Sequence, residues 1–149
     1  MDVGQVGFVR AAGIRALQLH QLLYERTGGR IGHRLLGIPN LLLRTVGAKT
    51  GQQRTSCLTY ARDGDSYLVV ASMGGAPVHP GWYHNLRADP AVEIQIGTHR
   101  QHATARVVNR GDADYDRMWT RVNENNHNRY KGYQRQTERP IPIVVLTPA

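Results

Sequence analysis

After Pro39 the chain is a succession of short β-rich segments separated by turn residues, and this alternation limits the folds open to it. The pairs Asp63-Gly64 and Gly97-Thr98 predict hairpin turns, because glycine tolerates positive φ there. Strands joined by hairpins and flanked by helices predict an antiparallel barrel in a mainly β or α+β chain. The segments that indicate strands are 40–46, 54–61, 66–72, 91–97, 99–108 and 141–147.

Three other segments have the pattern of helices. Apolar residues between 14 and 23 form a loose helical stripe that ends at Gly28-Gly29, where glycine suits a left-handed cap. Shorter helices are expected over 80–88 and 112–125. The 149 residues match one ordinary domain. We therefore expect a basic N-terminal helix over residues 1–30 and a β-barrel over residues 31–149.

The net charge of +8 favours an anionic partner: a phosphate-bearing cofactor, a nucleic acid or an anionic membrane surface. Cys57 is the single cysteine, so no internal disulfide can form and a reducing compartment, the cytoplasm, is expected. No apolar run approaches the length of a membrane span, and the first ten residues lack the features of a signal peptide.

The stretch "GAKTGQQR" at 47–54 carries two cations in a turn that a hairpin could make with two residues. It is not a nucleotide-binding P-loop, because Ala48 separates Gly47 from Lys49. Glycines let backbone N–H groups approach an anion, and Lys49 and Arg54 are close enough in sequence to converge on it. On spacing alone, a solvated loop with ordinary surface cations remains the alternative.

The stretch "ASMGGAPVHPGWYHNLRADP" leads from a buried strand into two glycines and then into a helix. Ser72 offers a hydroxyl at the sheet edge, and the exposed N–H groups after it suit a rim that faces a ligand. For Trp82 and Leu86 the preferred interpretation is structural: they plug one end of the barrel.

Catalysis by the protein's own acids, bases or metals is not indicated. His99 and His102 lie three apart on a strand and so point to opposite faces, which does not suit zinc. Cys57 has no evident histidine partner and is expected to be a small buried hydrophobe. Any chemistry is therefore expected to come from a bound cofactor.

Three sequence motifs together resemble those of a known protein family. The turn G-x-K-[ST]-G-x-x-R, the rim A-S-x-G-G and the helix W-Y-x-N-L-x-A-[DN]-P occur in that order within roughly residues 35–149, and the chain resembles the deazaflavin-dependent nitroreductase family of actinobacteria. The resemblance implies a split β-barrel, like that of FMN-binding split-barrel proteins, and 8-hydroxy-5-deazaflavin coenzyme F-420 as cofactor. The cofactor-binding residues that it implies are Lys49, Gly51, Gln52, Gln53, Arg54, Ser72, Met73, Gly74, Gly75, Ala76, Pro77, Trp82, Tyr83 and Asn85.

On the acceptor side, the resemblance implies Tyr130 and Tyr133 as substrate-side residues, with His127 in the place of a third tyrosine. The segment "NRYKGYQ" lacks clear periodicity and indicates a mobile loop, which Gly132 would let bend over the cofactor. The expected reaction passes a hydride from the reduced deazaflavin to a quinone, an activated alkene or a nitro compound. Thr59 precedes Tyr60 where nitroimidazole-activating members carry tyrosine, so activity on nitroimidazoles is not expected.

Two sets of alternatives stay open. FMN in place of the deazaflavin, or a cofactor- or lipid-binding protein without turnover, would fit the same barrel. The N-terminal helix, with Arg10, Arg15, Arg26 and Arg30, would cover the cofactor tail, contact an anionic membrane or simply pack on the barrel. A nucleic-acid role is not expected, because the aromatic residues lie mostly in helices and the C-terminal loop. A homodimer is compatible with the sequence.

Overall fold

The structure is a computed structural model that describes residues 18–27, 34–35 and 38–149. Within these residues eight strands form one sheet, in which every neighbouring pair is antiparallel. The order is β1-β2-β6-β7-β8-β5-β4, and β3 pairs with β2 off this path. The strands are β1 (Arg34–Leu35), β2 (Ile38–Val46), β3 (Gln53–Thr59), β4 (Ala61–Asp63), β5 (Ser66–Val70), β6 (Ala91–Ile96), β7 (His99–Val108) and β8 (Ile143–Pro148).

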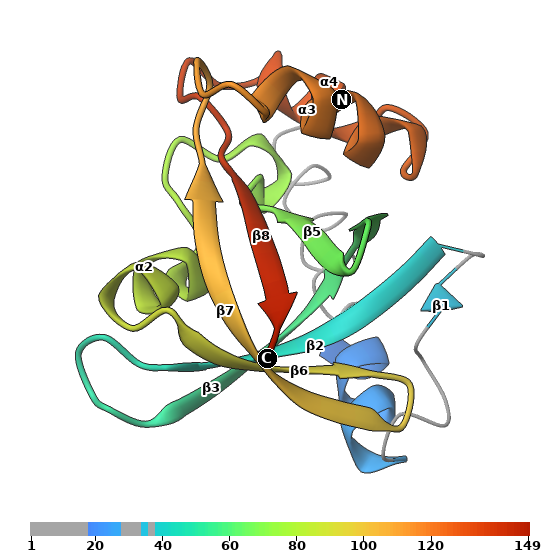
Figure 1. Cartoon of the computed structure of the whole chain (residues 1–149), viewed down its shortest axis with the longest axis vertical. Coiled ribbons are helices and arrows are strands. Elements are labelled where there is room, and N and C mark those ends of the chain that lie inside the picture. Colours follow the sequence, from blue (N-terminus) through green and yellow to red (C-terminus); the bar gives the residue numbers. More distant parts are fainter. Residues whose placement is uncertain (1–17, 28–33, 36–37) are drawn as a thin grey trace, which may run out of the picture.

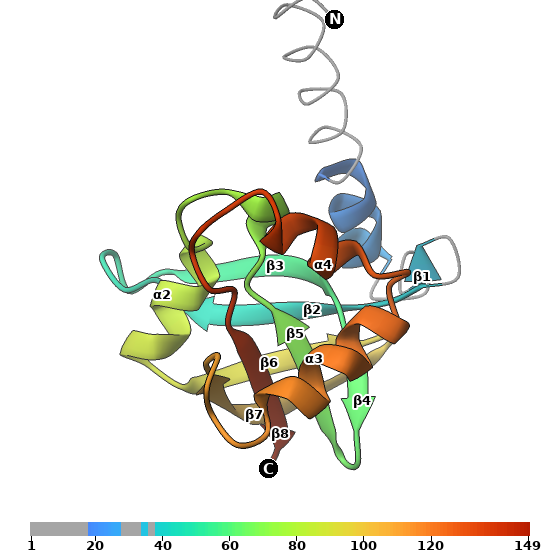
Figure 2. The ribbon, with the colours of Figure 1, turned by 90° about the horizontal axis from the view of Figure 1, so that it is seen from above.

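The sheet curls into a half-closed barrel, and α3 and α4 lie together across one end of it (Figure 1). The helices are α2 (Gly81–Ala88), α3 (Tyr115–Glu124) and α4 (Arg129–Gln134), with a short 3-10 helix η1 (Met73–Gly75) after β5. Residues 18–26 form a further helix, which stands beside the sheet in Figure 2. The predicted antiparallel split barrel is confirmed.

The predicted strands are present, with differences at their ends. The segment 54–61 is not one strand, because β3 ends at Thr59 and β4 starts at Ala61. Tyr60, between them, donates its backbone N–H to the carbonyl of Pro39. Both predicted hairpin glycines adopt the left-handed conformation, with φ of 60° at Gly64 and 57° at Gly97.

The core lies on both faces of the curled sheet, because side chains alternate along each strand. In β8, Val144 and Leu146 pack with Trp82 and Leu86 of α2, whereas Ile143 and Val145 pack beneath α3 and α4. Both α2 side chains are buried in the first cluster. The preferred structural interpretation of Trp82 and Leu86 therefore agrees with their packing.

Tyr24 fastens the helix at 18–26 to the barrel. Its ring is fully buried, and its hydroxyl lies 3.1 Å from the Gln95 carbonyl and accepts a hydrogen bond from the Gly97 N–H at 2.9 Å. Burial raises the pKa of Tyr24 to about 12, so the phenol stays protonated. Packing on the barrel, one of the three expectations for this helix, thus holds for its described part.

Several expectations for the N-terminal segment lie outside the described residues. These are the helix before residue 18, its end at Gly28-Gly29, and the cations Arg10, Arg15 and Arg30. The division into residues 1–30 and 31–149 stays a prediction. Among the residues that the structure describes, no helix has the length and apolar character that a membrane crossing requires.

Candidate functional site

The connection between β2 and β3 is a compact turn. The Gly47 N–H donates to the Gln52 carbonyl at 2.7 Å, and the Gly51 N–H donates to the Gly47 carbonyl at 2.8 Å. Gly51 has a φ of +70°, and a Cβ at Gly47 would lie 2.8 Å from the Thr50 hydroxyl oxygen. The glycines therefore allow a turn that leaves Lys49 exposed at its tip.

A cavity of about 610 Å³, here called the loop cavity, lies between this turn and α2. Asn85 of α2 ties the two together: its Oδ1 accepts from the Ala48 N–H at 3.0 Å, and its Nδ2 donates to Thr45 Oγ1 at 3.2 Å. Asn85 thus holds the turn in place. The cavity is lined by Gly47, Ala48, Lys49, Thr50, Arg54, Thr55, Ser56, Gly81, Trp82, His84 and Asn85.

The loop cavity is suited to an anion. Lys49 and Arg54 are exposed and both line it, and no carboxylate is among the described residues that line it. Gly81, the first residue of α2, also lines it, so the positive end of the helix dipole adds to the two side-chain charges. Lys49 and Arg54 line the same cavity, and their convergence on an anion stays a prediction.

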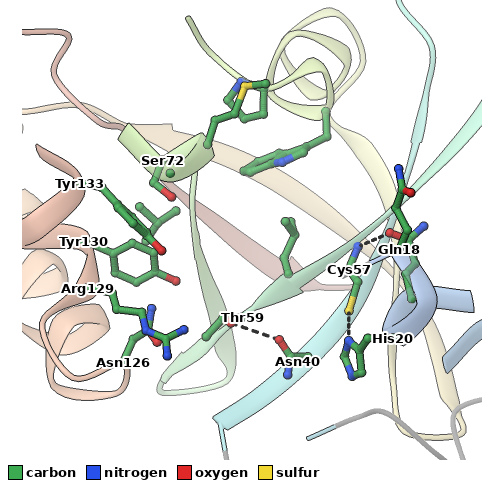
Figure 3. Close-up of a pocket in the computed structure, with 17 residues that line it drawn as sticks. Gln18, His20, Asn40, Cys57, Thr59, Ser72, Asn126, Arg129, Tyr130 and Tyr133 are labelled. Atoms are coloured by element: carbon green, nitrogen blue, oxygen red, sulfur yellow. Dashed lines mark hydrogen bonds between the residues drawn. The ribbon is translucent and has the colours of Figure 1, made fainter. Parts of the chain in front are cut away.

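A second cavity, here called the central cavity, has a volume of about 500 Å³. Figure 3 shows Tyr130, Tyr133 and Asn126 on one side of it, facing Thr59, Cys57 and the helix at 18–26. Trp82 lines both cavities, so the two lie on either side of this ring. The lining is Gln18, His20, Gln21, Asn40, Cys57, Leu58, Thr59, Val70, Ser72, Met73, Gly74, Pro80, Trp82, Asn126, Arg129, Tyr130 and Tyr133.

The predicted rim is partly in the central cavity. Ser72, Met73 and Gly74 line it, and Met73 adopts a φ of 46°, an uncommon value for a residue with a side chain. Gly75 instead packs under α4, where an added Cβ would lie 2.7 Å from the Tyr133 carbonyl oxygen. Gly75 therefore joins the rim to α4.

Other predicted residues lie away from these two cavities. Gly51 and Gln53 line a separate cavity beside β6 and β7, and the Gln52 carbonyl closes the turn. Ala76, Pro77 and Tyr83 are outside the lining of the loop and central cavities. Tyr83 is buried with its ring centroid 4.3 Å from that of His79, which indicates a packing role.

Arg139 holds the rim from behind, and sequence reasoning missed it. Its guanidinium donates to the carbonyls of Ala71, Ser72 and Ala76 at 3.0 to 3.1 Å. It also lies 2.8 Å from His79 Nδ1, and burial together with this cation lowers the pKa of His79. Backbone carbonyls carry no sequence signature, so only the "ERP" before the last strand could have drawn attention to this arginine.

Replacing Arg139 with alanine should lower the free energy of unfolding by about 1 to 2 kcal/mol, because three carbonyls lose a charged donor. Arg139→Lys should restore part of the loss, since one ammonium group can reach only some of the three. Chemical denaturation measures both, with exposed Arg135→Ala as the matched control. Equal stability of Arg139→Ala and Arg135→Ala would show that the rim needs no clamp.

The segment predicted to be a mobile loop is a helix, so that prediction was wrong. Residues Arg129–Gln134 form α4, and Gly132 lies inside it. Its first turn is held from α3, because Asn123 Oδ1 accepts from the Lys131 N–H at 3.0 Å. A six-residue helix capped by another helix has no periodicity of its own, which is why the sequence did not reveal it.

Tyr130 and Tyr133 both line the central cavity, as expected for a substrate side. Tyr130 is 6% exposed and packs with Met118 and Ile141 beneath α3. Burial raises the pKa of Tyr130, and a hydrogen bond from the Asn126 side chain opposes this rise. The phenol is therefore a protonated donor at neutral pH. His127, in the place of a third tyrosine, is exposed with a φ of 53°.

Cys57 does have a histidine partner, contrary to expectation. Its Sγ lies 3.7 Å from Nδ1 of His20, which is 37 residues earlier in the chain (Figure 3). Burial raises the pKa of the Cys57 thiol to about 12, so the group stays protonated. The thiol is thus a half-buried wall group, and no metal-binding cluster of histidine, cysteine or carboxylate side chains occurs in the described part of the chain.

Comparison with known proteins identifies relatives for this arrangement. A family model described as F420H(2)-dependent quinone reductase matches residues 16–148. A Mycobacterium tuberculosis protein with the same description is 60% identical over 139 residues, which are 93% of each chain. A solved structure described as an F420-H2 dependent reductase is 35% identical with a TM-score of 0.65, and covers 72% of this chain and 93% of its own. Another solved structure, described as a domain-swapped dimer, is 32% identical with a TM-score of 0.67. The match covers 95% of this chain and 98% of that one.

Proposed function

The chain belongs to the F420H(2)-dependent quinone reductase family, and we propose that it binds coenzyme F-420 across the loop and central cavities and reduces a quinone beside it. When bound, the reduced deazaflavin supplies the hydride. One observation carries the proposal. Trp82 lines both cavities. Lys49 and Arg54 line the loop cavity with no carboxylate among its described lining residues, whereas the central cavity is lined mainly by polar and aromatic groups and by one arginine, Arg129.

The loop cavity has the donors that a cofactor phosphate requires. Lys49 and Arg54 supply positive charge, and the start of α2 adds backbone N–H groups. Because the turn is closed by backbone hydrogen bonds and tied to Asn85, these groups are held in place before the cofactor arrives. The donor set therefore fits a phosphate monoester or diester.

Beyond Trp82, the rim of Ser72, Met73 and Gly74 is proposed to lie along the cofactor ring. The Met73 side chain is exposed, so it would offer the ring an apolar contact. Arg139 fixes the rim carbonyls and leaves the Ser72 hydroxyl on the cavity side, where Figure 3 shows it. Ser72, Met73 and Gly74 carry no charge. Their proposed role is therefore to orient the cofactor ring and to exclude water from it.

Beside this rim, Tyr130 of α4 is proposed to donate a hydrogen bond to a quinone oxygen as negative charge develops there. Its rotation is restricted by packing against Met118 and Ile141, so the hydroxyl is placed in advance. Thr59 lines the same cavity across from Tyr130, but its Oγ1 already donates to Asn40 Oδ1 at 3.1 Å. Tyr130 is therefore the candidate catalytic donor, with Tyr133 beside it.

A binding measurement tests the proposal directly. Purified protein should change the fluorescence of coenzyme F-420 on binding, should not bind FMN comparably, and should reduce menadione with the reduced deazaflavin. Binding of FMN with no binding of F-420 would point to a flavin protein of the same fold. Binding of both without turnover would point to a carrier.

The remaining expectations concern the assembly of the protein and its location. A homodimer is supported by the domain-swapped dimer among the relatives. Contact with an anionic membrane stays a prediction, for which the described part of the chain offers Leu19, Leu22 and Leu23, all exposed on the helix at 18–26. Location in the cytoplasm also stays a prediction.

A further inference from the structure

The side-chain oxygen of Asn126 is a buried hydrogen-bond acceptor without a donor among the described residues. Its side chain is only 4% exposed, and its Oδ1 has no hydrogen-bond partner among the residues that the structure describes. The residue lines the central cavity (Figure 3). A buried acceptor without a donor costs about 1 to 3 kcal/mol, so such groups call for an explanation.

The neighbouring asparagines do not share this property. Asn123 donates to the Trp119 carbonyl at 2.8 Å and accepts from the Lys131 N–H, so it joins α3 to α4. Asn125 donates to the Tyr60 carbonyl at 2.7 Å, so it joins the end of α3 to the barrel. Both have structural partners, whereas the Asn126 oxygen has none among the described residues.

Asn126 and Tyr130 lie four residues apart and line the same cavity. The Asn126 side chain lowers the pKa of Tyr130, but burial has the larger effect and keeps that pKa above its ordinary value. The Tyr130 hydroxyl therefore stays protonated and can donate. Together the two side chains offer one donor, the Tyr130 O–H, and one acceptor, the Asn126 carbonyl.

The backbone beside Asn126 is strained. His127 and Asn128 have φ values of 53° and 60°, and two successive left-handed residues with side chains are costly. The Asn128 N–H is held by the Asn123 carbonyl at 2.9 Å, which fixes this unusual corner. Strained backbone of this kind is common at ligand-binding sites, and here it directly follows Asn126.

We propose that Asn126 is a specificity-determining residue, the acceptor half of a pair with Tyr130 that recognises a neutral O–H or N–H donor next to a ligand oxygen. This inference rests on the proposed function. A quinone has only acceptor oxygens, so it pairs with Tyr130 alone. The hydroquinone product carries hydroxyl groups, and the lactam of the deazaflavin carries an N–H beside a carbonyl. Both sources present the same chemistry to Asn126.

The test uses two redox-inert product analogues that differ in one donor, 4-methoxy-1-naphthol and 1,4-dimethoxynaphthalene. Calorimetry gives the Kd of each for the protein saturated with oxidised F-420. The wild type should bind the naphthol about tenfold more tightly, the scale of one hydrogen bond. Asn126→Leu, or Asn126→Ala if leucine prevents folding, should reduce this preference to less than about threefold.

Two variants separate recognition from folding. Asn126→Asp keeps an acceptor oxygen and should keep the preference for the naphthol. Asn125→Ala should lower the melting temperature but keep the full preference, because its partner is the Tyr60 carbonyl. If Asn126→Leu weakens F-420 binding about tenfold while the naphthol preference persists, the recognised donor is the lactam N–H.

The inference is overturned if Asn126→Leu changes neither the naphthol preference nor the Kd of F-420. In that case the wild type would still bind the deazaflavin and reduce menadione, so the proposed function would stand. A wild type that neither binds F-420 nor reduces menadione would overturn the proposed function as well as the inference that rests on it. The two failures are therefore distinguishable in one set of measurements.

Discussion

Alanine in place of Lys49 or Arg54 should each weaken the binding of coenzyme F-420 by about 1.5 to 3 kcal/mol, or roughly tenfold to 150-fold. Each cation lines the loop cavity, and no described carboxylate of that lining competes with the cofactor phosphate. Because both side chains are exposed, the effect should shrink as salt is added, and unfolding should change little. Fluorescence titration of the deazaflavin measures the Kd.

The control for this pair is Arg106→Ala. Arg106 is exposed on β7 and is not part of the loop cavity's lining, so its removal lowers the overall charge by the same amount. If Arg106→Ala weakens F-420 binding as much as Lys49→Ala does, the attraction is a property of the whole basic surface. In that case the double variant Lys49→Ala, Arg54→Ala should raise the Kd of F-420 no more than the removal of any two other exposed cations.

Tyr130→Phe should slow menadione reduction by about 10- to 100-fold while leaving F-420 affinity within about twofold. The phenyl ring fills the same buried space, so only the hydroxyl is lost. Because burial keeps the pKa of Tyr130 above its ordinary value, the donor stays protonated. The ratio of wild-type to variant rates should therefore be constant from about pH 6 to pH 9.

Tyr115→Phe provides the matched control for loss of a buried hydroxyl. Tyr115 packs in the same cluster as Tyr130, and its hydroxyl donates to the Ile141 carbonyl at 2.6 Å instead of lining the central cavity. The Tyr115→Phe variant should lose about 1 kcal/mol of unfolding free energy and should reduce menadione at the wild-type rate. A normal rate in both Tyr130→Phe and Tyr133→Phe would leave orientation by the cavity as the whole of catalysis.

The strands and their turns could be predicted because the signal is local. Short β-rich runs mark β5 to β8, and glycine at Gly64 and Gly97 marks the turns that need positive φ. The three residues of β4 were merged with β3, because a break of one residue at Tyr60 leaves no trace in the pattern. Local sequence patterns therefore predict the strands of the sheet but not the exact ends of every strand.

The candidate site was predictable only where its chemistry lies within one segment. Lys49 and Arg54 are five positions apart, and the glycines between them mark a turn. The contact of His20 with Cys57 and the clamp of Arg139 on the rim join residues 37 to 68 positions apart. The capping of α4 by Asn123 likewise depends on how two helices pack. Such contacts follow from the fold and have no local signature.

One wall of the central cavity is formed by the helix at 18–26, which is not part of the barrel. Gln18, His20 and Gln21 belong to a helix that the fully buried Tyr24 attaches to the sheet. Gln18 and His20 contribute only side chains of this helix to the wall, whereas Gln21 also supports β3, because its side chain hydrogen-bonds the Thr55 carbonyl and the Cys57 N–H. The shape of the central cavity therefore depends on a segment that is not a strand of the barrel.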